Sequence, residues 1–261
     1  MGRLQSKGIR MAQNEPLTLK GIRTAQNEPL TFKRLVAIGD LLGFRDRVLT
    51  RPTREVVETT IAYLRNALYF AIHREPTTEP PPLEQLEQQS RIGIAWFSDT
   101  ILLYTLDDTD ETCSFLLEVV AYLLFFTTIP NNARMRIGID YNELYVDRTN
   151  RIYVGPALVH AFELQAAQAW AGGALTPNAA ARAAHLPKNH VVEYDVPLKD
   201  NKVSSRAAID WTFGIHTPVR FEWSRTTAAP TPEDDQGIVL KWRNTKRFHD
   251  EHCEICRLTY A

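Results

Sequence analysis

The stretch that most constrains the fold is residues 34–44, which read RLVAIGDLLGF. The apolar run from Leu35 to Ile38 predicts a buried strand that leads directly to Asp40. Gly43 follows two leucines later and permits a tight turn, because glycine has no side chain to restrict its backbone. A carboxylate beside exposed backbone N–H groups could hold a metal ion and a polyphosphate together. The alternative is an aspartate that caps a short helix.

Residues 91–106, RIGIAWFSDTILLYTL, contain two further apolar runs that are joined at Ser98 and Asp99. This pattern predicts a β-hairpin of residues 92–97 and 100–106 with Asp99 at its tip. If the strand before Asp40 pairs with this hairpin, two carboxylates converge at one edge of a sheet. Two carboxylates with no cation between them repel each other, so the pattern predicts a site for a divalent metal.

The order of the predicted elements indicates an α+β fold. Apolar residues at helical spacing predict helices at residues 53–72, 111–127 and 156–170. Further apolar runs predict strands at residues 34–38, 136–139, 142–146 and 152–154. Together with the hairpin, the order is β-α-β-β-α-β with extra strands, which is typical of a ferredoxin-like core. In that core the first strand neighbours the hairpin, so we expect Asp40 to lie beside Asp99.

The two ends of the chain flank this core. Residues 1–33 hold a short tandem repeat, GIRMAQNEPLTLK followed by GIRTAQNEPLTFK, and are expected to be flexible. Residues 34–175 are expected to form the core that carries both carboxylates, and residues 176–261 an elaboration of the same domain. In this last part the pattern predicts a helix at 179–184 and strand-like segments at 210–215 and 237–242. Within the core, the proline-rich residues 75–89 predict a stiff, exposed connection or a short acidic helix.

Charge and cysteine content limit the possible partners and the compartment. The formal net charge is −1, so nothing indicates a nucleic-acid partner. No apolar run reaches the length of a membrane span, and three cysteines are too few for a disulfide framework. We therefore expect a cytoplasmic protein without a membrane partner. The tail motif HCEIC, with His252, Cys253, Cys256 and the nearby His249, could ligate zinc, but a plain exposed tail is the preferred interpretation.

Three segments resemble the motifs of class III nucleotide cyclases, in the order of that family. GDLLGF (residues 39–44) resembles the first metal motif, and FSDTILLY (97–104) resembles the second. MRIGIDYNELYVDRTNRIYVGPALVHAFELQ (135–165) resembles the later hairpin and the helix after it. The resemblance covers roughly residues 35–175. It implies the class III cyclase version of the ferredoxin-like fold and a homodimer with two equivalent sites.

The same resemblance implies a reaction assisted by two divalent cations, Mn or Mg. The ribose 3′-oxygen of a nucleoside triphosphate would attack the α-phosphorus, and pyrophosphate would leave. Asp40 and Asp99 would be the catalytic, metal-binding carboxylates, and the backbone carbonyl of Leu41 would be a further metal ligand. The phosphates would lie on the turn that follows, which consists of Leu42, Gly43, Phe44 and Arg45.

The sequence departs from the family where the base is read. Purine cyclases of this class place Lys or Glu where this chain has Ala95, and a base-reading Asp or Cys where it has Ile152. Neither side chain can hydrogen-bond a purine edge. Phe97 shares a strand face with Ala95. It could therefore complete the base pocket by filling the space of a purine's second ring, with ordinary core packing as the alternative.

A second departure concerns the phosphates. The Asn and Arg that usually follow on the last helix fall on Val159 and Glu163, so the usual transition-state arginine is missing. Another cation would have to take its place. The candidates, each of which could instead be a surface residue, are Arg45, Arg51, Arg54 and Lys241.

Over nearly its whole length, the sequence resembles the pyrimidine cyclases of bacterial Pycsar anti-phage systems. The motifs that carry this resemblance are GDLLGF, FSDTILLY, GPALVHAFELQ (155–165) and IVLKWRNTKRF (238–248). The resemblance implies a uridylate cyclase, or with lower preference a cytidylate cyclase, that uses UTP or CTP. Its cyclic product would activate a downstream cyclic-nucleotide-sensing effector. The alternatives are a purine cyclase with an unusual pocket and a catalytically silent module that binds a nucleotide or a partner.

Overall fold

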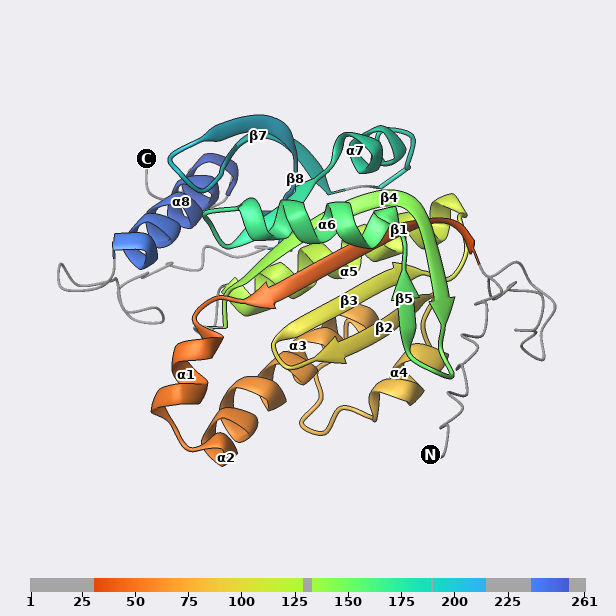
Figure 1. Cartoon of the computed structure of the whole chain (residues 1–261), viewed down its shortest axis with the longest axis horizontal. Coiled ribbons are helices and arrows are strands. Elements are labelled where there is room, and N and C mark those ends of the chain that lie inside the picture. Colours follow the sequence, from red (N-terminus) through yellow and green to blue (C-terminus); the bar gives the residue numbers. More distant parts are fainter. Residues whose placement is uncertain (1–30, 129–132, 189, 215–235, 254–261) are drawn as a thin grey trace, which may run out of the picture. The chain divides into compact units, whose positions relative to one another are not determined.

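The computed structural model describes residues 31–128, 133–188, 190–214 and 236–253 (Figure 1). The strands are β1 (Thr31–Leu41), β2 (Ile92–Phe97), β3 (Thr100–Thr105), β4 (Met135–Asp147), β5 (Ile152–Val154), β6 (Gly172–Leu175), β7 (Val191–Pro197) and β8 (Val203–Ile209). The helices are α1 (Phe44–Thr50), α2 (Thr53–Val56), α3 (Ala62–His73), α4 (Leu83–Gln88), α5 (Asp110–Thr128), α6 (Pro156–Ala167), α7 (Pro177–Ala183) and α8 (Gln236–His252). A π-helical turn, Val57–Ile61, joins α2 to α3, and a 3-10 turn, Thr212–Gly214, follows β8.

These strands form one mixed sheet in the order β2-β3-β1-β4-β6-β8-β7, with β5 paired to β4. Within it, β1 lies between β3 and β4 and is antiparallel to both, and β2 is antiparallel to β3. This is the strand arrangement of a ferredoxin-like core. The predicted α+β fold with additional strands is therefore confirmed.

The two faces of the sheet bury different residues of β1, because successive side chains of a strand point to opposite faces. Leu35, Ala37 and Leu41 belong to the large hydrophobic core, which also contains the inner faces of α3 and α5. Val36 and Ile38 belong to a smaller core that includes Ala157 and Ala161 of α6. Figure 1 shows α6 lying along β1 and β4. Asp40 has the parity of Val36 and Ile38, so it lies on the α6 face.

The core helix α5 is the one helix among the described residues whose length and composition would allow it to cross a membrane. It is mostly buried, with 61% of its apolar window inside the protein. Such burial is typical of a helix that packs on a sheet in a hydrophobic core.

Several predicted boundaries change in the structure. The segments predicted as two strands at 136–139 and 142–146 form the single strand β4. Asp140 and Tyr141, which the prediction left between the two strands, pair in register with Val36 and Leu35 of β1, so the strand continues through them. Thr31–Lys33, which we expected in the flexible N-terminal segment, belong to β1, while residues 1–30 lie outside the described part.

The C-terminal segments differ most from the prediction. Residues 237–242 lie in α8 rather than in a strand, and residues 212–214 form a 3-10 turn. Phe248 of α8 packs against Trp170 and Trp211, which are both fully buried. A helix that buries one apolar stripe against two tryptophans is stabilised by this packing even though its other residues are mostly polar. The strands β7 and β8, which we did not predict, extend the sheet beyond β6.

Candidate functional site

The predicted carboxylates lie at the same edge of the sheet. Asp40 near the end of β1 pairs in register with Thr100, the first residue of β3. Asp99 immediately precedes Thr100 in the tight turn between β2 and β3, in which Ser98 has a positive φ of 56°. Both carboxylates are partly exposed. The antiparallel pairing of β1 with the hairpin therefore brings these two predicted site residues to one edge.

Asp40 has a cationic neighbour that we did not predict. Arg136 of β4 is the register partner of Asp40 on its other side. Its Nη2 lies 2.8 Å from Asp40 Oδ2, and its Nε lies 3.2 Å from Oδ1. The Gln165 amide of α6 also donates to Oδ1. Both oxygens of Asp40 thus have protein partners, and its charge is compensated by a bidentate arginine.

The glycine turn after β1 has a different arrangement from the predicted phosphate cradle. The N–H of Leu42 donates to the carbonyl oxygen of Arg134 at 2.8 Å, so it is not free for a phosphate. Gly43 has φ of 75° and begins α1, with open space where a side chain would be. Phe44 and Arg45 lie in the first turn of α1, whose N–H groups have no partner within the helix. Any backbone contact to a phosphate therefore falls on the residues from Gly43 onwards.

Two arginines near this turn were missed in the sequence. Arg47 of α1 lies within hydrogen-bond reach of the Thr60 hydroxyl, at 3.5 Å. Burial and the nearby Arg51 lower the pKa of Arg47, and burial together with Arg47 lowers the pKa of Arg134 to about 10. Each of these guanidinium groups lies near another positive charge, and such a local excess of positive charge favours an anion. In the sequence these arginines are separated from one another, and only the folded turn brings them together. No local pattern therefore indicated a positively charged site.

Of the other candidate cations, Arg45, Arg51 and Arg54 are exposed, and Lys241 is half-buried. Arg51 and Arg54 form ion pairs within the same turn of helix, with Glu55 at 3.3 Å and with Glu58 at 2.6 Å. Arg45 is strongly exposed and lies 3.6 Å from the Asp46 carboxylate. Lys241 lies in α8. Surface pairs of this kind contribute little energy and do not position a phosphate.

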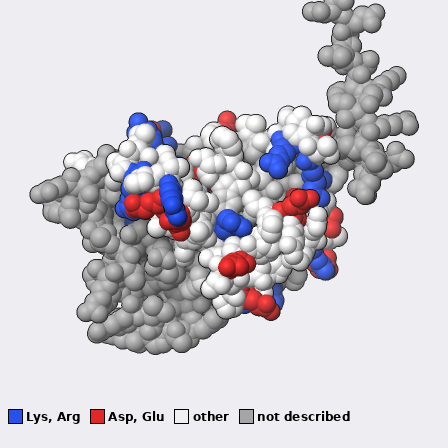
Figure 2. Space-filling view, turned by 90° about the horizontal axis from the view of Figure 1, so that it is seen from below, with Lys and Arg blue, Asp and Glu red and all other residues white. Residues whose placement is uncertain are grey.

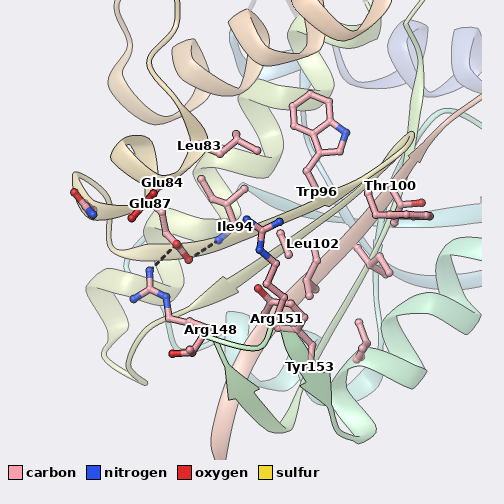
Figure 3. Close-up of a pocket in the computed structure, with 16 residues that line it drawn as sticks. Leu83, Glu84, Glu87, Ile94, Trp96, Thr100, Leu102, Arg148, Arg151 and Tyr153 are labelled. Carbon is pink, nitrogen blue, oxygen red and sulfur yellow. Dashed lines mark hydrogen bonds and ion pairs between the residues drawn. The ribbon is translucent and has the colours of Figure 1, made fainter. Parts of the chain in front are cut away.

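The hairpin borders an open pocket of about 860 Å³ on the α6 face (Figure 3). It lies where α6 covers β1 and β4 but leaves β2 and β3 accessible. Ala95, Phe97 and Thr100 line it, together with Ile38 and Leu102. Its volume is in the range of small-molecule sites. The pocket therefore adjoins the row of paired strand residues that contains Asp40 and Thr100.

The three predicted base-pocket residues behave differently. Ala95 lines the pocket without a polar group. Phe97 also lines it but is 84% exposed, so the alternative of ordinary core packing was wrong. Ile152 is not part of the lining, although Arg151 and Tyr153 on either side of it are. The alternation of side chains along β5 explains why the neighbours, rather than Ile152, face the cavity.

Residues 75–89 form part of this pocket rather than only an exposed connection. Their helix α4 contributes Leu83, Glu84, Glu87 and Gln88 to the lining. Glu87 accepts the N–H of Ile94, at 3.0 Å, on the outer edge of β2. The carboxylate thereby satisfies a backbone donor of an edge strand and fixes α4 against the sheet.

Val159 and Glu163 of α6, where the resemblance to class III cyclases implies an Asn and an Arg, have other neighbours in the structure. Val159 is half exposed, and Glu163 borders a smaller pocket of about 450 Å³ with His160 and Arg206. His160 Nδ1 lies 3.2 Å from a carboxylate oxygen of the buried Asp140. No arginine therefore occupies the position of the usual transition-state residue.

The tail motif does not form a metal site within the described residues. His249 and Cys253 are buried in and just after α8, and Cys256 lies outside the described part. The preferred interpretation of a plain exposed tail was therefore wrong for His249 and Cys253, whereas Asp250 and Glu251 are exposed. No group of three His, Cys, Asp or Glu side chains close enough to bind a metal occurs in the ranges that the structure describes.

Charged side chains of both signs are interspersed on the face seen from below (Figure 2). Within the described surface most side chains are uncharged, and blue and red groups lie close to one another. Large single-sign fields are the usual footprint of nucleic-acid binding. The described part of this face carries no such field.

Comparison with known proteins gives distant structural matches. No protein-family model and no curated protein match the chain. The adenylyl cyclase CyaB from P. aeruginosa is similar with 12% identity and a TM-score of 0.45, over 69% of this chain and 95% of that one. An adenylate/guanylate cyclase/hydrolase from Silicibacter pomeroyi has 14% identity and a TM-score of 0.40, over 68% and 95%. Adenylate cyclases from Trypanosoma brucei have 11% identity and a TM-score of 0.40, over 70% and 91%. At these values the likeness assigns no function, which we derive from the site.

Proposed function

We propose that this chain is a metal-dependent class III nucleotide cyclase that converts UTP, or less readily CTP, to the 3′,5′-cyclic monophosphate and pyrophosphate. The observation that carries this proposal is the convergence at the end of β1. Register pairing sets Asp40 against Thr100, next to Asp99, and the glycine turn follows Asp40 directly. The accessible pocket reaches the same row of paired residues, because Thr100 and its partner Phe97 both line it.

The donor set fits a divalent cation that arrives with its substrate. Mg²⁺ is commonly held by one or two carboxylates and by the substrate's own phosphates rather than by a complete protein cage. Asp40 and Asp99 would supply the carboxylates, and the Leu41 carbonyl is the further candidate. Bound there, Mg or Mn would acidify the ribose 3′-hydroxyl and neutralise charge on the triphosphate.

Arg136 gives the site a cation that the sequence alone did not identify. For Asp40 to bind a metal, Arg136 must release at least one of its carboxylate oxygens. Its guanidinium would then lie beside the incoming phosphates, and planar guanidinium groups bind phosphate oxygens in the same bidentate way as carboxylates. Arg47 and Arg134 add positive charge on the side of the glycine turn. These three residues could together replace the family arginine that is absent at Glu163.

The choice of base, the biological role and the homodimer rest on sequence resemblance and on exposed apolar side chains. The choice of a pyrimidine agrees with Ala95, which offers no hydrogen bond to a purine. The role in anti-phage defence, through an effector that senses the cyclic nucleotide, follows from the resemblance to Pycsar cyclases. A homodimer is supported by exposed apolar side chains on β5 and α6, which are Val154, Val159 and Phe162.

The proposal is tested with Asp40→Ala and Asp99→Ala. Each variant should lose cyclic-nucleotide formation with Mn²⁺ while its circular dichroism spectrum stays that of the wild type. Asp195→Ala, which changes an exposed carboxylate on β7, is the matched control and should keep its turnover. Retained turnover in both site variants would falsify the metal assignment.

A catalytically silent binding module is the second candidate, because a specific observation favours it. Arg136 and Gln165 together satisfy Asp40 in the absence of any metal. A degenerate enzyme could keep Asp40 for this structural pair alone. In that case calorimetry would detect nucleotide binding without any cyclic product, and the affinity would not depend on Mn²⁺.

A further inference from the structure

The inner end of the pocket is a pre-organised polar wall built around Glu87. One oxygen of this carboxylate accepts the Ile94 N–H at 3.0 Å and faces the Tyr104 hydroxyl at 3.4 Å, and the other lies 2.7 Å from Arg148. The Glu87 side chain is only 15% exposed. Burial and the nearby Glu87 charge raise the pKa of Tyr104, so its hydroxyl remains a donor. Three of the roughly four lone-pair positions of Glu87 are therefore in use.

The turn between β4 and β5 is fixed as well. The Asp147 carboxylate accepts the backbone N–H of Asn150 at 2.9 Å and its side-chain amide at 2.8 Å. Arg151 follows with a positive φ of 55°, immediately before β5. Because the turn is held by Asp147 and is tied to α4 through Arg148, the backbone position from which the Arg151 side chain starts is set by the fold.

Arg151 is the accessible donor at this end of the pocket. Figure 3 shows its side chain extending over Ile94 and Leu102, whereas Glu84 lies on α4 at the margin. Among the described residues, no carboxylate forms an ion pair with Arg151, while Arg148 is bound to Glu87. The group that Arg151 offers over Ile94 and Leu102 is a guanidinium fork, which has donors only.

We propose that Arg151 reads the keto oxygen of the nucleobase, so that the pocket selects uracil over cytosine. This inference rests on the proposed cyclase function. An arginine fork matches bases that present acceptors, such as O4 of uracil or O6 of guanine, and opposes the amino groups of cytosine and adenine. Asp40 pairs with Arg136 at one end of β4, whereas Arg151 adjoins Asp147 at the other end, about 30 Å away at about 3.3 Å per residue. The carboxylates that hold the phosphates of a base in this pocket would therefore belong to a second copy of the chain.

The test compares UTP, CTP, GTP and ATP in the wild type, in Arg151→Ala and in Arg151→Glu, with Mn²⁺ and mass spectrometry of the products. The wild type should prefer UTP over CTP by about 10-fold, near the lower end of the discrimination by a base-edge contact, because O4 of uracil is a single acceptor. Arg151→Ala should bring this ratio close to one, and Arg151→Glu, which presents acceptors, should favour CTP. Arg243→Ala on the exposed side of α8 is the control and should keep the wild-type ratio.

A parallel binding measurement separates this inference from the proposed function. Calorimetry with UTP and CTP in the presence of Ca²⁺ reports base selection even if no chemistry occurs. Selective binding that Arg151→Ala abolishes, without any cyclic product, would support Arg151 and contradict the cyclase activity. A wild-type ratio that is unchanged in Arg151→Ala would overturn the role of Arg151. Equal use of GTP and UTP would keep that role but contradict the choice of a pyrimidine.

Discussion

Removing the positive charge of Arg136 should destabilise the protein by about 2–3 kcal/mol. In Arg136→Met, Asp40 would lose hydrogen bonds of 2.8 and 3.2 Å to a charged group. One such bond contributes about 1.5–3 kcal/mol, and breaking a fully buried pair costs about 3–5 kcal/mol. The side chains of Arg136 and Asp40 are 11% and 25% exposed, so the lower range applies. For a chain of this size, this corresponds to a fall in Tm of about 5–10 °C.

The assay is a double-mutant cycle in urea with Arg136→Met, Asp40→Asn and the double variant. The coupling free energy should be about 2 kcal/mol, because each single change leaves the other group without its partner. Mn²⁺ should raise the Tm of Arg136→Met more than that of the wild type, in which the metal must first displace Arg136. A coupling below about 0.5 kcal/mol, as at exposed pairs, or an equal effect of Mn²⁺ on both proteins, would refute the proposed competition.

Three further predictions concern the scaffold around the site. A Cβ on Gly138 would lie 2.0 Å from the Ala161 carbonyl oxygen, so Gly138→Ala should cost about 3 kcal/mol in urea unfolding; unchanged stability would contradict the close packing of α6 on β4. Burial lowers the pKa of His249, so the unfolded chain takes up its proton first, and stability should fall as the pH drops below about 6.5; His249→Phe should flatten this slope. Burial raises the pKa of Cys113 to about 11, and iodoacetamide at about pH 8 should modify it only after unfolding.

Much of the fold was predictable because local patterns and pairing rules agreed. The runs around Ile38 and in the hairpin have strand composition, and the long helices show helical spacing. The β-α-β-β-α-β order then leaves few arrangements of the sheet. This was sufficient to place Asp40 next to the turn that carries Asp99.

The contacts of Asp40 could not be predicted in the same way. Its pairing with Arg136 depends on the register between β1 and β4, and register is set by packing across the whole sheet. Gln165 reaches the same carboxylate only because α6 lies close to the strands at Gly138, where no side chain intervenes. Contacts of this kind arise from tertiary structure, and no local motif encodes them.

The prediction of a strand in the C-terminal helix failed for a different reason, the short length of the sequence window. Residues 237–242 begin with an apolar run that favours a strand, but Thr245, Phe248 and His249 further along are buried at helical spacing. A longer window would have shown this stripe. The pocket-lining role of α4 was missed because proline and acidic residues indicated an exposed connection, and only the structure shows that Glu87 turns back to the sheet.

The central claim is most directly tested by incubating the purified protein with Mn²⁺ and each of the four ribonucleoside triphosphates and identifying the products by mass spectrometry. The account predicts one dominant product, cyclic UMP, together with pyrophosphate, and its loss in Asp40→Ala. The absence of any cyclic nucleotide from folded protein, with UTP recovered intact, would contradict the proposed cyclase activity and favour the binding module.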